Sequence, residues 1–242
     1  MQRLTSLKLA GAVAGIWAAL SLAGWARGGV YLAKHEGDAV HLLDILLRME
    51  AGQRPHLDFM TPIGDFAFWP IVWAMRLGAE AGAALVWAQI GLAAVLTILA
   101  WYLGRSRLGL GGGIAIGGIL AVLCLAFVHG TSEPTLSISM HYNRWAWALS
   151  FPLVLLALVP PGHEGLKRFD GILIGVLAML LVLTKVTYAI GLAPGVLVAL
   201  LARRDFKTVL LASIAFGAGV VVVTLIQGLG FWTAYFLDVV RV

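Results

Sequence analysis

Long apolar runs, separated by short polar segments, make up most of this sequence. An apolar helix needs roughly 17 to 25 residues to cross a bilayer. Seven segments come close to or meet this length and are expected to span a membrane: 7–25, 83–103, 112–128, 145–159, 171–188, 190–202 and 209–229. The pattern therefore predicts an all-α protein, a polytopic bundle of transmembrane helices that forms a single domain over residues 1–242.

The longest polar run covers residues 31–69 and separates the first two predicted spans. Within it, segment 37–51 has helical periodicity, with Asp38, His41, Asp44 and Arg48 on one arc. The opposite side is mostly apolar: Leu42, Leu43, Leu46, Leu47 and Met49. We expect an amphipathic helix lying in the plane of the membrane interface, in the first extracytoplasmic loop.

Segment 66–77 is apolar but short, and Pro70 interrupts it. An interfacial or re-entrant segment suits it better than a full crossing. With that choice, every cluster of basic residues falls on one side, which the positive-inside tendency assigns to the cytoplasm. The N-terminus is then cytoplasmic, and loops 31–69 and 129–144 face outward. The clusters are Arg3/Lys8, Arg105/Arg107, Lys167/Arg168 and Arg203/Arg204/Lys207.

Composition supports this interpretation, because 61% of the residues are hydrophobic and only 12% are charged. A soluble domain carries about 25% charged residues. The net charge of +5 is explained by the cytoplasmic loops, so no nucleic-acid partner is expected. The single cysteine, Cys124, excludes a disulfide framework and a thiolate metal site.

Asp38 is the candidate catalytic residue. It opens the predicted surface helix, where the helix dipole stabilises a carboxylate, and it could deprotonate an acceptor. The alternative is that Asp38 merely caps the helix. Glu36 and Asp38 are also candidate ligands for a divalent metal ion. However, the region lacks an H-E-x-x-H or cysteine pattern, so metal binding stays open.

Two further groups could hold a phosphate. His141, Asn143 and Arg144 lie where the second outer loop enters a span, and cationic side chains there suit phosphate oxygens. The alternative is an aromatic belt with a snorkelling arginine. Lys185, with Tyr188 nearby, lies in an apolar run, where a lysine costs at least about 2.5 kcal/mol at the bilayer centre. Snorkelling is again the alternative.

The first outer loop resembles that of the GT-C glycosyltransferases, which include protein O-mannosyltransferases and aminoarabinose transferases. The resemblance implies a seven-span module, a polyprenyl-phosphate-linked sugar donor, a catalytic acid at Asp38 and basic residues near Lys185. Family members often have an acidic pair where this chain has Glu36-Gly37-Asp38, and they usually continue with further spans. The residues that carry the resemblance are Asp38, Gly52, Pro55, Asp58, Phe59, Pro62 and Gly64.

The predicted function is transfer of a sugar from a polyprenyl-phosphate donor to an unknown acceptor at the extracytoplasmic face of a bacterial-type inner membrane. The predicted substrate-binding residues are His41, Asp58, His141, Asn143, Arg144, Lys185 and Tyr188. A transporter or lipid flippase is a competing interpretation, which would need broken helices at the membrane midplane. A third is a non-catalytic, truncated GT-C-like module.

Overall fold

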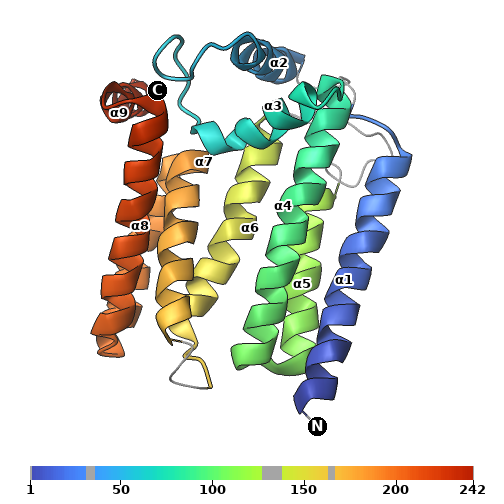
Figure 1. The fold of residues 1–242 in the computed structure, drawn as a ribbon, viewed down its shortest axis with the longest axis vertical. Coiled ribbons are helices and arrows are strands. Elements are labelled where there is room, and N and C mark those ends of the chain that lie inside the picture. The colour runs from blue at the N-terminus through green and yellow to red at the C-terminus, as the bar shows by residue number, and fades with distance from the viewer. Residues whose placement is uncertain (1, 31–35, 127–137, 163–166, 242) are drawn as a thin grey trace. The chain divides into compact units, whose positions relative to one another are not determined.

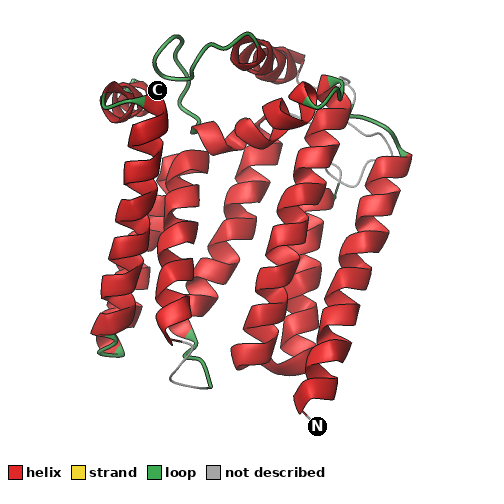
Figure 2. Cartoon of the chain, viewed as in Figure 1, coloured by secondary structure: helices red, strands yellow, loops and turns green. Residues whose placement is uncertain are grey.

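The structure is a computed structural model that describes residues 2–30, 36–126, 138–162 and 167–241. Within these ranges the chain folds into helices and their connections, without a strand (Figures 1 and 2). Pro55 and Phe59 form an isolated β-bridge. The predicted all-α fold class is confirmed.

The first five elements are α1 (Gln2–Ala26), α2 (Glu36–Glu50), the 3-10 turn η1 (Asp65–Ala67), α3 (Trp69–Arg76) and α4 (Ala81–Leu103). They are followed by the π-helical turn η2 (Gly104–Leu108), α5 (Gly109–Leu125) and α6 (Ile138–Leu158). The chain continues with α7 (Lys167–Ala202), α8 (Phe206–Gln227) and α9 (Gly230–Val240).

Four helical stretches in the described part are long and apolar enough to cross a membrane: Leu4–Ala26, Ala81–Leu125, Arg168–Ala202 and Phe206–Gln227. On α8, large apolar side chains such as Val221, Val222 and Leu225 are exposed. Lipid is the environment in which such an outward-facing apolar surface is stable. α6 is not among the four stretches, because polar side chains occupy its first turns. The chain is therefore a membrane protein.

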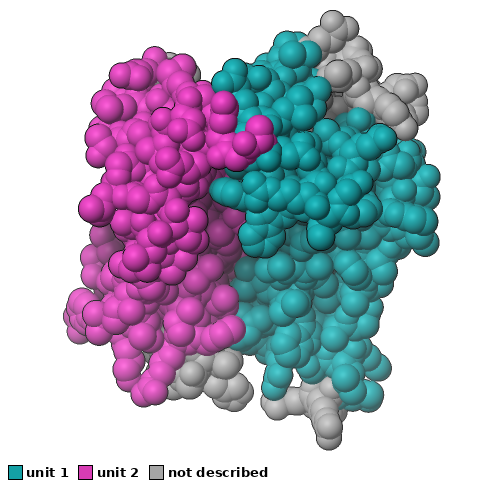
Figure 3. All heavy atoms as spheres, turned by 45° about the horizontal axis from the view of Figure 1, so that its top comes forward, with its two compact units in different colours: residues 1–50, 69–148 teal, residues 51–68, 149–242 magenta. Residues whose placement is uncertain are grey.

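The described residues group into two compact units, which Figure 3 colours separately. Unit 1 comprises residues 1–50 and 69–148, and unit 2 comprises residues 51–68 and 149–242. α6 contributes its first half to unit 1 and its second half to unit 2. The single domain over residues 1–242 stays a prediction.

In unit 1, α4 and α5 form an antiparallel hairpin through η2. A Cβ atom on Gly104 would lie 2.8 Å from the Cα of Gly113, and one on Gly117 would lie 3.5 Å from the Cβ of Ala100. Because glycine has no side chain, the two backbones can approach this closely, as in many membrane helix pairs. Leu9 of α1 packs against the same two opposed glycines.

Two short helices of unit 1, α2 and α3, pack together. Arg76 at the end of α3 donates a hydrogen bond from Nη2 to the carbonyl oxygen of Met49 in α2, at 3.2 Å. With 8 residues, α3 is about 12 Å long, whereas the hydrocarbon core is about 30 Å thick. This agrees with the prediction that segment 66–77 does not cross the membrane.

In unit 2, α7 is divided by one extended residue, Lys185, with φ −156° and ψ 100°. Its first arm, residues 167–184, runs parallel to α8. A Cβ atom on Gly175 would lie 2.3 Å from the carbonyl oxygen of Ala212, and a later pair, Met179 and Gly219, is also in contact.

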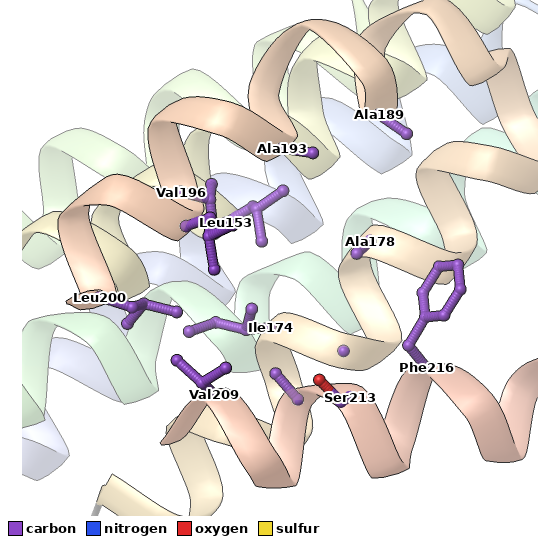
Figure 4. Close-up of a pocket in the computed structure, with 13 residues that line it drawn as sticks. Leu153, Ile174, Ala178, Ala189, Ala193, Val196, Leu200, Val209, Ser213 and Phe216 are labelled. Carbon is purple, nitrogen blue, oxygen red and sulfur yellow. The ribbon is translucent and has the colours of Figure 1, made fainter. Parts of the chain in front are cut away.

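The second arm, residues 186–202, connects the first arm to α8 through a short turn, so it must run back in the opposite direction. Figure 4 shows the result, with Leu200 of the second arm beside Ile174 of the first arm and Val209 of α8. α7 is thus a helical hairpin. The sequence predicted two spans here, 171–188 and 190–202, but the division lies at Lys185 rather than at residue 189.

The turn after α7 has its own polar anchors. Asp205 caps α8 by accepting a hydrogen bond from the backbone N–H of Thr208 at 3.3 Å, which satisfies one free helix N–H. Arg203 donates from Nη1 to the carbonyl oxygen of Ala157 at 2.7 Å, near the end of α6. Asp205 therefore satisfies a backbone N–H at the start of α8, and Arg203 satisfies a backbone carbonyl group near the end of α6.

Candidate functional site

The α2 helix presents Asp38 and His41 on its exposed face. Its buried face carries Ile45, Leu46 and Met49. This confirms the predicted amphipathic helix, although Leu47, expected on the apolar side, has 49% of its surface exposed. Leu47 lies at the edge of the buried face, next to Leu46, and therefore remains exposed.

Asp38 lies in the first turn of α2 and not at the residue before the helix, because α2 already begins at Glu36. Asp44, on the same arc, is ion-paired with Arg48 at 2.8 Å, as its i,i+4 spacing predicts. Within the described residues, Asp38 makes no such pair. Its carboxylate is therefore exposed and not held in an ion pair within the described residues. The side chain of Glu36 lies outside the described residues.

A tight loop in unit 2, the motif loop (residues 52–59), contains four of the residues that carry the resemblance, with the spacing G-x-x-P-x-x-D-F: Gly52, Pro55, Asp58 and Phe59. Gly52 has φ +90°, a left-handed conformation that glycine adopts without strain. Asp58 accepts a hydrogen bond from the backbone N–H of Arg54 at 2.7 Å, and its carboxylate lies 3.6 Å from the Arg54 side chain. Asp58, a predicted substrate-binding residue, thus closes the turn of its own loop and remains exposed.

His56 belongs to the same loop, and its fully buried ring is the centre of a buried polar cluster. Nδ1 of His56 lies 3.0 Å from Oδ2 of Asp238 in α9. Nε2 lies 3.4 Å from Oδ1 of Asp65 in η1, within ion-pair distance, and neither of these two atoms makes a hydrogen bond in the described structure. The imidazole can donate to both carboxylates together only when both ring nitrogens carry hydrogen.

Each carboxylate of the cluster accepts a hydrogen bond from a group other than His56. Oδ2 of Asp238 accepts the backbone N–H of Thr61 at 3.2 Å, and Oδ2 of Asp65 accepts from the side-chain amide of Gln227 at 2.6 Å. Burying two carboxylates is costly unless they are paired and hydrogen-bonded. These donors, together with the imidazole, supply the compensation.

Two aromatic rings of α9 enclose the imidazole. The Phe231 ring lies edge-on at 5.5 Å between centroids, and the Tyr235 ring lies at 4.6 Å. Burial raises the pKa of the Tyr235 phenol above its usual range, and the nearby Asp65 carboxylate raises it further. Tyr235 therefore remains a hydrogen-bond donor, and it donates to the carbonyl oxygen of Val182 at 2.5 Å.

The cluster is poorly suited to a metal ion. Asp65 and Asp238 lie at different nitrogens of one ring, which point in different directions, so the two carboxylates do not converge on one position. No group of three or more His, Cys, Asp or Glu side chains in the described ranges could hold a metal ion. The arrangement instead suits a structural role, as a polar network that connects the loop to helix ends.

The three candidates at the start of α6 belong to unit 1. His141 is fully buried and packs edge-on against Trp145, with 5.0 Å between ring centroids. Arg144 donates a hydrogen bond to the carbonyl oxygen of Ala126, at the end of α5. Asn143 is half-buried. Their roles in substrate binding stay predictions, but His141 and Arg144 also have packing and capping roles.

Lys185 and Tyr188 lie at and just after the turn of α7, and both are half-buried. The structure thus places Lys185 between two antiparallel arms rather than inside one continuous span. Asp38 and His41 share one face of α2 in unit 1, whereas Asp58, Lys185 and Tyr188 belong to unit 2.

An apolar cavity of about 290 Å³ lies among α6, the two arms of α7 and α8 (Figure 4). Of the side chains that line it, only that of Ser213 is polar. A smaller apolar cavity of about 150 Å³ can hold a benzene ring. This cavity therefore suits hydrocarbon but has no group that could bind a charged headgroup.

Sequence reasoning missed the His56 cluster, although a signal existed. Gln227 and Asp238 lie in the nearly apolar C-terminal segment, and isolated polar residues in such segments usually have a partner. His56 gave no comparable signal, because it lies in a loop rich in polar residues.

Comparison with known proteins adds no further assignment to this geometry. No family model, no curated protein sequence and no solved structure matches the chain.

Proposed function

We propose that this chain is a membrane glycosyltransferase that transfers a sugar from a polyprenyl-phosphate donor to an acceptor at the extracytoplasmic face of a bacterial-type inner membrane. One observation carries the proposal. The surface helix α2 holds an exposed carboxylate, Asp38, that no ion pair engages within the described residues, on a chain with membrane-spanning helices.

In the proposed reaction, Asp38 accepts the proton of the acceptor's hydroxyl or amine. The acceptor atom then bonds to the anomeric carbon of the sugar, while the bond from that carbon to the phosphate oxygen breaks. Its electron pair leaves on the polyprenyl phosphate, so atoms and charge balance. Lys185 is assigned to the donor phosphate, because a cation stabilises the charge that develops there.

The folded motif loop supports this proposal. Four of the residues that carry the resemblance to GT-C enzymes, Gly52, Pro55, Asp58 and Phe59, lie in a defined turn. In it Gly52 has its left-handed backbone and Asp58 accepts a hydrogen bond from Arg54. Asp58 and His41 stay assigned to substrate binding, as do His141, Asn143, Arg144 and Tyr188. A divalent ion at Glu36 and Asp38 stays an open alternative.

Transport is less well supported. A transporter typically has discontinuous helices near the midplane, with backbone groups lining a central site. The discontinuity in α7 is a turn between two antiparallel arms, and two of its carbonyl groups, those of Thr184 and Val182, accept from Gly64 and Tyr235. The break that could have indicated transport therefore has a structural explanation.

The test is sugar release from synthetic polyprenyl-phosphate sugars by the full chain in lipid vesicles, with water or an added lipid alcohol as acceptor. Asp38→Asn should lower the rate by about 100-fold or more, as expected for loss of a general base. Asp44→Asn is the matched control on the same helix face and should leave the rate within about twofold, since an exposed ion pair contributes little. Unchanged activity in a folded Asp38→Asn variant would contradict the assignment.

A further inference from the structure

We infer that the buried cluster of His56, Asp65 and Asp238 positions Lys185 by holding the two hydrogen-bond donors that end the first arm of α7. The inference rests on the proposed function only for the task given to Lys185. The cluster would be a positioning device, since it touches neither the donor nor the acceptor.

The first step concerns the end of the arm. The last four carbonyl groups of a helix have no partner inside that helix. In the first arm of α7, Val182 O accepts from the Tyr235 hydroxyl at 2.5 Å, and Thr184 O accepts from the Gly64 N–H at 3.3 Å. The next residue, Lys185, is extended. Two groups from outside α7 therefore stabilise the point at which the helix stops.

The second step concerns how closely these donors are held. Gly64 lies directly against the arm, because a Cβ atom there would be 2.2 Å from the carbonyl oxygen of Leu183. Gly64 immediately precedes Asp65, and Tyr235 lies three residues before Asp238 in α9. Each donor is thus next to one carboxylate of the cluster.

The third step joins the two carboxylates. The His56 ring lies between them, with Nδ1 at hydrogen-bond distance from Asp238 (3.0 Å) and Nε2 at ion-pair distance from Asp65 (3.4 Å). Through this ring the motif loop is connected to α9, and the Gly64 and Tyr235 donors are held in one arrangement. Loss of the bridge should let the donors move independently and change the surroundings of Lys185.

The backbone of His56 also indicates a constrained position. Its φ is +67°, a left-handed conformation that is uncommon for residues other than glycine and is tolerated best by asparagine and aspartate. Such conformations persist only where the surroundings determine them. His56→Asn is therefore the appropriate variant, because it keeps the backbone conformation and removes the two-sided bridge.

The environment of Lys185 can be measured directly by reductive ¹³C-methylation of the full chain in detergent micelles, followed by NMR. The chain has five lysines, Lys8, Lys34, Lys167, Lys185 and Lys207, so Lys185→Arg identifies the Lys185 signal. Tyr235→Phe removes one capping donor and keeps the ring. Trp232→Phe is the matched control, because it removes an aromatic donor of α9 that bonds Thr224 in α8 rather than α7.

The Lys185 signal should shift in Tyr235→Phe and in His56→Asn, and should keep its position in Trp232→Phe. An unchanged Lys185 signal in folded Tyr235→Phe overturns the inference, whether or not His56→Asn folds. An equal shift in Trp232→Phe overturns it as well, because the effect would then be general to α9.

A kinetic readout connects this positioning to the reaction. In Tyr235→Phe, the donor concentration for half-maximal transfer should rise about fivefold, which corresponds to one hydrogen bond, with the maximal rate within twofold. Absence of transfer in the unsubstituted chain would refute the proposed function but leave the NMR result standing. Conversely, active enzyme with an unmoved Lys185 signal would refute only the positioning.

Discussion

At the residue scale, two close contacts in unit 2 are the most informative. The Cα of Gly64 lies against the backbone of Leu183, and the His56 ring lies between two carboxylates. Local sequence indicates neither arrangement. Gly64 is one of the residues that carry the resemblance to GT-C enzymes, and in the structure it lies against the first arm of α7 and donates to the carbonyl oxygen of Thr184.

Replacement of Gly64 by alanine should destabilise the protein by about 1–3 kcal/mol, because the added methyl group forces a backbone shift. Gly191→Ala is the control, since a Cβ atom there meets nothing within 4 Å. It should be neutral or stabilising by up to about 1 kcal/mol. Unfolding in SDS titrations measures both, and equal effects would show that Gly64 is not closely packed.

Tyr235 predicts a pH dependence. Its pKa in the folded protein is raised by burial and by Asp65, whereas in the unfolded chain it ionises near pH 10. Above about pH 10 the unfolded state loses this proton first, so folding stability should fall as pH rises. Tyr235→Phe should show a smaller loss of thermal stability between pH 9 and 11. Parallel pH profiles for the two proteins would contradict this.

At the element scale, amphipathicity placed α2 correctly, because 3.6-residue periodicity is a local property of the sequence. It could not assign Leu47, which lies at the border of the apolar arc, because only the packing of α2 in the folded chain decides which side of the helix is covered. The break in α7 was also placed three to four residues too late. Apolar length alone does not reveal where Gly64 and Tyr235 cap the helix.

Met49 and Leu47 offer a direct comparison, being 1% and 49% exposed on the same helix. Met49→Ala should destabilise the protein by about 2–5 kcal/mol, because it leaves a cavity between α2 and α3. Leu47→Ala should stay within about 0.5 kcal/mol. The comparison uses the same SDS titrations. A larger effect of Leu47→Ala would mean that the other face of α2 is the packed one.

At the scale of the whole molecule, the arrangement of basic residues is the basis for the predicted topology. Arg105 follows α4, and Gln53 lies in the motif loop, and both are exposed. The positive-inside tendency predicts that the first is cytoplasmic and the second extracytoplasmic.

Single cysteines at these two positions test the topology. In a Cys124→Ala background, an impermeant thiol reagent added to intact cells should label Gln53→Cys, and it should label Arg105→Cys only in inverted vesicles. Labelling of both from the same side would mean that segment 66–77 crosses the membrane. Asp38 and Arg144 would then be assigned to opposite leaflets, and the proposed function would fail.

The all-α fold class, the apolar stretches that can span a membrane and the amphipathic helix that carries Asp38 can all be predicted from the amino-acid sequence. Each of these follows from hydrophobicity and periodicity within 10 to 25 consecutive residues, which a linear pattern records. Three other features could be seen only in the folded chain: His56 contacts Asp238, 182 positions away, Gln227 contacts Asp65, and α7 turns at Lys185. The reason is that a buried polar group needs a hydrogen-bond partner, which can come from any helix end or loop that packs beside it. No local sequence pattern specifies which group that will be.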